Sequence, residues 1–579
     1  MATDETKKVT YFGLTDSRNK QIPFGIKAED RTRHVYVIGK TGMGKSTLLE
    51  NMAVQDIKNG NGFAFIDPHG KSTDLLLEYI PEERMKDVIY FAPFDTDYPI
   101  SFNVLEQVDP DKKHLVVSGL MSTFKKIWQD AWSARMEYIL TNTLLALLEY
   151  PGATLLGVNR MLADKEYRKK VVDNIKDPGV RSFWVDEFAK YTEKFAAEAT
   201  PAIQNKIGQF TANPLIRNMI GQEKSSFDIR DIMDKKKIMI INLSKGKIGE
   251  SNANLLGGML ITKIYLGAMS RADVSNAELN KLPNFYLFVD EFQNFANESF
   301  ADILSEARKY KLNLTIAHQY IEQMEEEVAA AVFGNVGTMI TFRVGAHDAE
   351  VLEKEFAPKF TADDLVNLGK YQMYLKLMID GVTSQPFSAT NMPPIPQPEK
   401  SLRDEIIASS RAQFALKRAD IEGRIADWHQ PIVSAPKVRV EPRPMERPPA
   451  AAFPRVGNPL PKTEARTVLR PEMPRPSQTP QPAQRPQRQY PPRPPQVPNR
   501  PPLESSDGFS SLKDIAAKIP TEKKAGTEEH KRDLRAALSD VLKKQPDKAV
   551  PPQPASPQPP QNNQTKKEVP EDVLRKILE

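Results

Sequence analysis

The chain has 579 residues, enough for about three or four average domains, but its 48 prolines divide it unevenly: 13 lie in residues 1–390 and 35 in residues 391–579. This distribution excludes a single continuous globule, and the lack of cysteine excludes disulfide scaffolds and cysteine-ligated zinc or iron–sulfur sites. The net charge of +5 is modest, yet residues 436–500 carry 13 Lys or Arg against 4 Asp or Glu, so the excess positive charge lies in the tail.

Short apolar segments separated by helical patterns predict the strands of one α/β domain. Several of these segments are unbroken apolar runs, such as 238–242 and 285–289, and this is typical of strands that are covered on both faces. We therefore expect a mainly parallel sheet. The predicted strands are residues 34–39, 62–67, 88–92, 237–243, 285–290, 312–318, 338–343 and 374–379.

The alternation of strands and helices stops between residues 111 and 234, where only helical patterns occur. We interpret this segment as an all-helical subdomain inserted into the sheet domain; ordinary crossover helices are the alternative, although the segment is long for one crossover. The predicted division is a first core part (1–110), the helical insert (111–234), a second core part (235–395), a C-terminal helix (396–430) and a disordered tail (431–579) with short amphipathic helices.

Neither a secretory signal nor a membrane-spanning segment is predicted. The longest apolar stretch, residues 255–269, is shorter than the roughly 20 residues that a spanning helix needs, and it contains Lys263. We expect a cytoplasmic protein whose recruitment to the inner membrane depends on a partner.

The strongest motif is a phosphate-binding loop that satisfies the pattern G-x-x-x-x-G-K-[ST], and it lies between a predicted strand and a predicted helix. Its glycines let backbone N–H groups approach a phosphate, Lys45 reaches the β- and γ-phosphates, and the Ser46 hydroxyl binds Mg²⁺. ATP and Mg²⁺ are therefore the predicted cofactors, in a RecA-like P-loop core. The predicted nucleotide-binding residues are Gly39, Lys40, Thr41, Gly42, Met43, Gly44, Lys45, Ser46 and Thr47.

A phosphate-binding loop needs an acidic strand end elsewhere, and Asp290 and Glu291 follow the apolar run 285–289. Asp290 is the predicted partner of Ser46 in holding Mg²⁺ and its hydration shell, and Glu291 is the predicted catalytic residue that polarises the attacking water.

Two further strand ends carry polar residues with open roles. Gln319 follows the strand 312–318 and either senses the γ-phosphate or simply contacts water. Asp67 ends the strand 62–67 and either faces the same crevice or belongs to a structural turn.

The order and identity of these motifs resemble the HerA/FtsK superfamily of hexameric pumping ATPases, and within it the TraG/TraD-type coupling proteins of type IV secretion and conjugation. The resemblance extends over about residues 10–395. It rests on segments 37–47, 65–70, 132–138, 289–293, 307–310 and 317–319.

The resemblance implies a homo-hexameric ring with ATP at the subunit interfaces and DNA threaded through the channel. Arg308 matches the position of an arginine finger that acts on the neighbouring subunit's nucleotide, and an unpaired surface arginine is the alternative. The helical insert would face the relaxosome and the substrate. Members of the family usually begin with a membrane anchor, and this sequence reaches its P-loop within 40 residues with none. Either a separate membrane protein recruits it, or it is a soluble HerA-like pump with another task.

The sequence contains no helix-turn-helix, zinc-finger or RNP-type motif, so we expect DNA binding without sequence specificity. Arginines spaced among prolines in the tail can follow a phosphate backbone, although a solvated linker with docking segments is the alternative.

The predicted function is an ATPase that drives DNA translocation as a coupling-protein-like component of a type IV secretion system. One alternative is a HerA-like translocase that processes DNA ends with a nuclease partner. A second is a nucleotide-dependent scaffold without translocation, and export of protein in place of DNA is also open.

Overall fold

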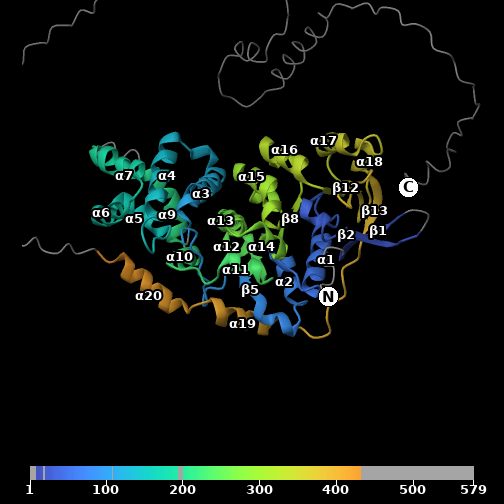
Figure 1. Ribbon diagram of the computed structural model, residues 1–579, viewed down its shortest axis with the longest axis horizontal. Coiled ribbons are helices and arrows are strands. Elements are labelled where there is room, and N and C mark those ends of the chain that lie inside the picture. Colours follow the sequence, from blue (N-terminus) through green and yellow to red (C-terminus); the bar gives the residue numbers. More distant parts are fainter. Residues whose placement is uncertain (1–7, 17–19, 107, 193–199, 432–579) are drawn as a thin grey trace, which may run out of the picture. The chain divides into compact units, whose positions relative to one another are not determined.

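The computed structural model describes residues 8–16, 20–106, 108–192 and 200–431, all within one compact unit (Figure 1). These residues form an eleven-stranded sheet in the order β2-β1-β13-β10-β9-β3-β8-β7-β4-β6-β5, and a two-stranded hairpin of β11 and β12. The strands are β1 (Val9–Thr15), β2 (Pro23–Lys27), β3 (Val35–Ile38), β4 (Gly62–Asp67), β5 (Val88–Phe91), β6 (Ile238–Asn242), β7 (Phe285–Val289), β8 (Leu312–His318), β9 (Thr338–Thr341), β10 (Gln372–Lys376), β11 (Met378–Ile379), β12 (Val382–Thr383) and β13 (Phe387–Asn391).

The predicted α/β fold with a mainly parallel sheet is confirmed. All neighbouring strands from β9 to β5 in the sheet run parallel. Each of the eight predicted strands is present, although the predicted strand 374–379 is divided between β10 and β11. The sequence patterns missed β1, β2, β12 and β13, because these strands are partly or fully exposed and contain Pro, Gly or polar residues.

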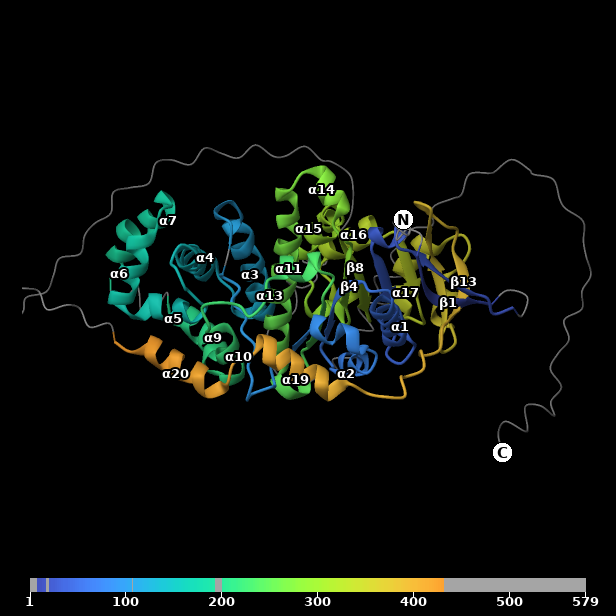
Figure 2. The ribbon, with the colours of Figure 1, turned by 60° about the horizontal axis from the view of Figure 1, so that its bottom comes forward.

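The unbroken apolar runs have the expected cause, since both faces of the parallel strands are covered. Along β3, Val35 and Val37 belong to one hydrophobic core, whereas Tyr36 and Ile38 belong to the other. Helices α1 (Lys45–Lys58) and α2 (Lys71–Leu77) pack on the first face; α13 (Glu250–Met269) and α15 (Glu298–Glu306) pack on the second. Figure 2 shows α1 and α13 on different sides of the strands.

Between β5 and β6, the described residues from Lys113 to Asp234 contain helices and turns but no strand. This segment carries α3 (Lys113–Ile127), α4 (Ala134–Leu148), α5 (Leu156–Ala163), α6 (Lys165–Asn174), α7 (Pro178–Ser182), α9 (Pro201–Ala212), α10 (Pro214–Ile220) and α11 (Ile229–Asp234). Two short helices, α12 (Lys245–Ile248) and α14 (Asn276–Lys281), flank α13, and the later helices are α16 (Glu326–Asn335), α17 (Ala346–Phe356) and α18 (Ala362–Val366).

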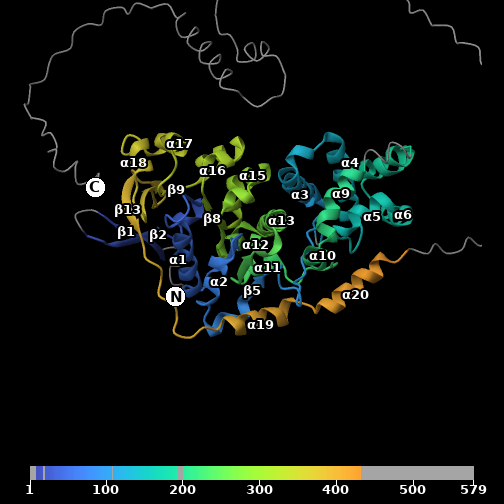
Figure 3. The same cartoon turned by 180° about the vertical axis from the view of Figure 1, so that it is seen from behind.

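The prediction of one C-terminal helix needs correction, because two helices occupy that segment (Figure 3). Helix α19 (Arg403–Phe414) packs on β5, and α20 (Arg418–His429) packs on α10. The helix is interrupted at Ala415, which is extended and pairs with Ile100, and the backbone N–H of Arg418 donates to the Asp97 carbonyl oxygen at 3.0 Å. These contacts replace the hydrogen bonds that a continuous helix would make.

Among the described residues, no helix has the length and apolar character needed to cross a membrane. The apolar stretch 255–269 lies in α13 and contributes to the core beside the sheet. The predicted tail and its amphipathic helices fall on residues 432–579, outside the described residues.

Candidate nucleotide-binding site

The P-loop connects the end of β3 to the start of α1, as the motif predicts. Gly39, Gly42 and Gly44 have φ values of 156°, 78° and 125°, a region that suits glycine. A side chain at position 39 would also place its Cβ 2.6 Å from the Cβ of Phe342. Lys45, Ser46 and Thr47 form the first turn of α1, where free backbone N–H groups favour an anion.

Lys45 is buried and lies across the P-loop. Its Nζ donates to the carbonyl oxygens of Gly39 at 2.6 Å and Lys40 at 3.4 Å. Burial lowers the pKa of Lys45, while the carboxylates of Glu291 and Asp290 act in the opposite direction. The lysine therefore lies close to both acidic residues that the sequence assigned to this site.

The predicted magnesium-binding pair is in direct contact. Ser46 Oγ donates to Asp290 Oδ2 at 3.0 Å, and the backbone N–H of Glu291 donates to Asp290 Oδ1 at 2.9 Å. Burial, together with the charges of Glu291 and Asp67, raises the pKa of Asp290 to about 6. A hydroxyl and a carboxylate are oxygen ligands of the kind that Mg²⁺ prefers, so the residues present fit this ion.

Glu291 is a buried residue in a left-handed conformation, with φ of 48°. One carboxylate oxygen accepts from Gln293 Nε2 at 2.6 Å, and the other accepts from Gln319 Nε2. His69 Nε2 lies 3.9 Å from the same oxygen as Gln319. A left-handed conformation is costly for a residue with a side chain, and such strain is often found at functional sites, where surrounding contacts maintain it.

Gln319 connects Glu291 to the P-loop. Its Oε1 accepts from Thr41 Oγ1 at 2.9 Å while its Nε2 donates to Glu291. The side chain therefore lies between the P-loop and Glu291, where a γ-phosphate sensor would be needed; its role in sensing stays a prediction.

Asp67 has a structural role in the turn before α2. Its carboxylate accepts backbone N–H groups of His69 at 2.7 Å, Ser72 at 2.8 Å and Thr73 at 3.3 Å. These bonds support the structural turn, and the charge of Asp67 also acts on Asp290, so the side chain lies near the same crevice.

Arg308 does not lie with the other predicted residues. It is in the 3-10 helix Ala307–Tyr310, directly before β8, whereas Gln319 follows that strand. Because β8 has seven residues, the two positions are about 20 Å apart at opposite edges of the sheet. Burial and the nearby charge of Arg33 lower the pKa of Arg308.

Comparison with known families gives the assignment. Residues 18–372, more than half of the chain, match the family described as the type IV secretion-system coupling protein DNA-binding domain. The chain belongs to this family. It is a TraG/TraD-type coupling protein of the HerA/FtsK superfamily of P-loop ATPases, as its motifs predicted.

Several solved structures are similar to this coupling protein. The plasmid coupling protein TrwB in complex with the non-hydrolysable GTP analogue GDPNP is 14% identical, with a TM-score of 0.49 over 68% of this chain and 91% of that chain. TrwB in complex with ADP and Mg²⁺ is 13% identical, with a TM-score of 0.49 over 68% and 98%. VirB4 of Thermoanaerobacter pseudethanolicus is 12% identical, with a TM-score of 0.45 over 68% and 97%. A comparison with curated proteins found no match.

The coupling protein also has P-loop contacts that the sequence analysis missed. Asn391, at the end of β13, donates from Nδ2 to the Gly44 carbonyl oxygen at 3.0 Å. The backbone N–H of Tyr371 donates to the Met43 carbonyl oxygen at 3.2 Å. Both residues come from the antiparallel part of the sheet, where no motif distinguishes them in the sequence.

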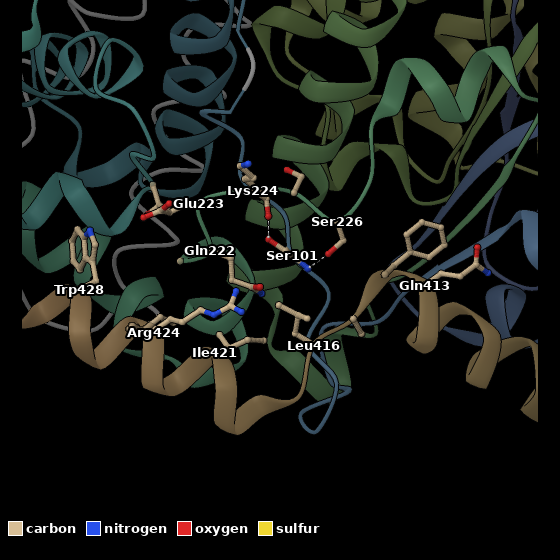
Figure 4. Close-up of a pocket in the computed structure, with 16 residues that line it drawn as sticks. Ser101, Gln222, Glu223, Lys224, Ser226, Gln413, Leu416, Ile421, Arg424 and Trp428 are labelled. Atoms are coloured by element: carbon tan, nitrogen blue, oxygen red, sulfur yellow. Dashed lines mark hydrogen bonds between the residues drawn. The ribbon is translucent and has the colours of Figure 1, made fainter.

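A cavity of about 490 Å³ lies elsewhere, between the C-terminal helices and residues 221–226 (Figure 4). Trp428, Ile421 and Leu416 line it together with Arg424 and Glu223. None of the predicted site residues lines this cavity, so it is separate from the nucleotide-binding site.

Proposed function

We propose that this coupling protein is a Mg²⁺-dependent ATPase that moves DNA through a hexameric ring in a type IV secretion or conjugation apparatus. The observation that carries the proposal is the hydrogen-bonded chain Thr41–Gln319–Glu291 beside the Ser46–Asp290 pair. It brings a P-loop hydroxyl, a candidate sensor and a candidate base to one edge of the sheet.

Each side chain has a distinct task in this proposal. Lys45 binds the β- and γ-phosphates, and Ser46 and Asp290 hold the metal ion, which when bound neutralises charge on the transferred phosphate. Glu291 accepts a hydrogen bond from the attacking water and turns it toward the γ-phosphate. Gln319 donates to a γ-phosphate oxygen or to that water, since its amide already lies beside Glu291.

Arg308 takes part across a subunit interface in this proposal. Its own P-loop is at the far end of β8, so its guanidinium can reach a phosphate only on another subunit. Stabilising the charge of the transferred phosphate is the known use of an arginine at such a position. The helical segment 111–234 then faces the DNA and the relaxosome, and a membrane-anchored component of the secretion system recruits the ring.

The test is ATP hydrolysis by the full chain with Mg²⁺, with and without single- or double-stranded DNA, at low and physiological salt. We expect DNA to stimulate hydrolysis, and we expect a strand-displacement assay to show movement along DNA. A hydrolysis rate that does not change when DNA is added, together with no strand displacement, would favour a scaffold or a protein substrate. Translocation only with a nuclease partner would favour DNA-end processing.

A further inference from the structure

The end of helix α3 contacts the loop that follows Glu291. The Lys126 side chain is half-buried, and its Nζ donates to the carbonyl oxygens of Gln293, at 2.7 Å, and of Ala296. Among the described residues, no carboxylate lies within ion-pair distance of Lys126. Its ammonium group therefore hydrogen-bonds to the backbone of this loop, where charge-assisted hydrogen bonds are stronger than neutral ones, and the charge of Glu325 acts on it from beyond ion-pair distance.

The loop connects Lys126 to the candidate base. Gln293, whose carbonyl oxygen Lys126 binds, donates from its own side chain to Glu291 Oε2 at 2.6 Å. Glu291 in turn accepts from Gln319, which accepts from Thr41 of the P-loop. A continuous chain of hydrogen bonds and one backbone segment thus leads from α3 to the P-loop.

Other contacts hold the same loop and the start of α15 along α3. Ser299 Oγ donates to Ser122 Oγ at 2.9 Å, and Asn297 Nδ2 donates to Thr123 Oγ1 at 3.4 Å. Figures 1 and 3 show α3 beside α15, which follows the loop. These contacts keep the loop against α3, while Lys126 contacts the part of the loop that lies next to Glu291.

The conformation of Glu291 explains why this contact matters. A residue with φ of 48° keeps its geometry only if surrounding bonds impose it. Asn294 Nδ2 donates to the Glu291 carbonyl oxygen at 2.9 Å, and Lys245 Nζ donates to Asn294 Oδ1 at 2.8 Å. The turn after Glu291 is thus held from α12 by Lys245 and from the helical segment by Lys126.

We infer that Lys126 is a positioning residue through which the helical segment controls the alignment of Glu291, so that binding of DNA or a partner to that segment changes the rate of ATP hydrolysis. The inference rests on the proposed function, because it assigns Glu291 to the hydrolysis step. It adds a route by which substrate engagement reaches the nucleotide site.

The variant Lys126→Met tests the inference, with Lys125→Met as its matched control. Lys125 is the next residue, and it forms an exposed ion pair with Glu298 at 2.7 Å. We expect Lys126→Met to lower kcat about 10- to 100-fold, because small misplacements of a catalytic group have effects of this size. The KM for ATP should change less than about threefold, since the P-loop contacts remain. Lys125→Met should stay within about twofold of the wild type.

Two further variants separate positioning from folding. Lys126→Arg keeps a cationic donor and should recover most of the lost kcat. Gln293→Ala removes the side-chain hydrogen bond to Glu291 but leaves the carbonyl oxygen that Lys126 binds. This variant should also lower kcat, and it tests the inference even if Lys126→Met fails to fold. Wild-type kcat per bound nucleotide in Gln293→Ala, or an equal loss in Lys125→Met, would overturn the inference.

A measurement without turnover separates this inference from the proposed function. Hydrogen exchange of residues 113–127 and 292–297 is followed upon addition of a non-hydrolysable ATP analogue with Mg²⁺. We expect both segments to change in the wild type, but only 292–297 to change in Lys126→Met or Lys126→Ala. If the exchange of both segments changes in the wild type but the wild type hydrolyses no ATP, the proposed function fails and the coupling stands. If residues 113–127 do not respond in the wild type, the coupling fails.

Discussion

The two edges of the parallel sheet differ in how their charges are compensated. At the carboxyl edge, Lys45 lies near Asp290 and Glu291, and side chains from separate segments hydrogen-bond to one another. At the amino edge, Arg308 lies near Arg33, and among the described residues neither forms an ion pair with a carboxylate. At the first edge, opposite charges lie close together within one chain, whereas the second edge has positive charge that an anion from elsewhere can neutralise.

His34 shows how the amino edge is built. Its buried ring accepts the Leu314 N–H at Nδ1, at 3.0 Å, and its Nε2 lies 3.2 Å from the Leu304 carbonyl oxygen. Burial, and to a smaller extent the charge of Arg308, lowers the pKa of His34 to about 4, so the ring is neutral at pH 7. The segment that precedes Arg308 is thus attached to the start of the P-loop strand.

The largest effect is expected at the carboxyl edge. Glu291→Gln keeps the shape of the side chain but removes its ability to accept a proton from water, so turnover should fall about 10⁴-fold while nucleotide binding persists. Steady-state hydrolysis and equilibrium binding of a fluorescent ATP analogue measure the two quantities. Glu298→Gln, an exposed nearby change, serves as the control. Normal turnover in Glu291→Gln would remove this residue from the catalytic role.

The amino edge is tested by Arg308→Ala, for which we expect a loss of about 10³-fold in turnover. If the arginine acts on a neighbouring subunit, mixing Arg308→Ala with Glu291→Gln chains should restore part of the activity, because some interfaces then hold both groups. Lys309→Ala, at the adjacent exposed residue, should behave as the wild type. Mixtures as inactive as their components would argue against action between subunits.

A smaller effect concerns stability and pH at the carboxyl edge. The pKa of Asp290 is raised to about 6 in the folded protein, above its ordinary value. The contribution of this carboxyl group to the stability of the folded state is therefore complete below about pH 4, and it is lost as the pH rises through 6. In Mg²⁺-free buffer at pH 8, Asp290→Asn should therefore unfold at a higher temperature than the wild type. The difference in the free energy of unfolding should be at most about 3 kcal/mol. The difference should disappear near pH 4.

Thermal unfolding at the two pH values measures this effect, with the exposed change Asp302→Asn as the control. An Asp290→Asn difference of equal size at both pH values would contradict the assigned cause, because it would not follow the ionisation of a buried carboxyl group.

The smallest effect tests the contribution of the antiparallel strands to the carboxyl edge. Asn391→Ala removes the hydrogen bond to the Gly44 carbonyl oxygen and should weaken nucleotide binding about fivefold, the size expected for one such bond. Equilibrium binding measures it, and Asn335→Ala, an exposed change outside the site, is the control. Unchanged binding would limit the antiparallel strands to a structural role.

Much of the carboxyl edge could be predicted because a parallel sheet brings the ends of its strands together. The P-loop follows β3, Asp290 and Glu291 follow β7, and Gln319 follows β8, so three separate motifs meet without further information. Their unbroken apolar runs identified these strands in the sequence. Arg308 was assigned its role from the family resemblance, and its place at the opposite edge follows from its position before the predicted strand 312–318.

The sequence by itself determined the sheet class, the order of the motifs and the membership of the chain in the coupling-protein family. These properties depend on periodicity and on short contiguous motifs, which local physical chemistry specifies. Only the tertiary structure decided that Asn391 contacts the P-loop, that Asp67 caps a helix and that Lys126 reaches the loop after Glu291. The contacts of Asn391 and Lys126 join residues far apart in the chain, and in all three cases the partners are backbone atoms, which carry no residue-specific pattern in the sequence.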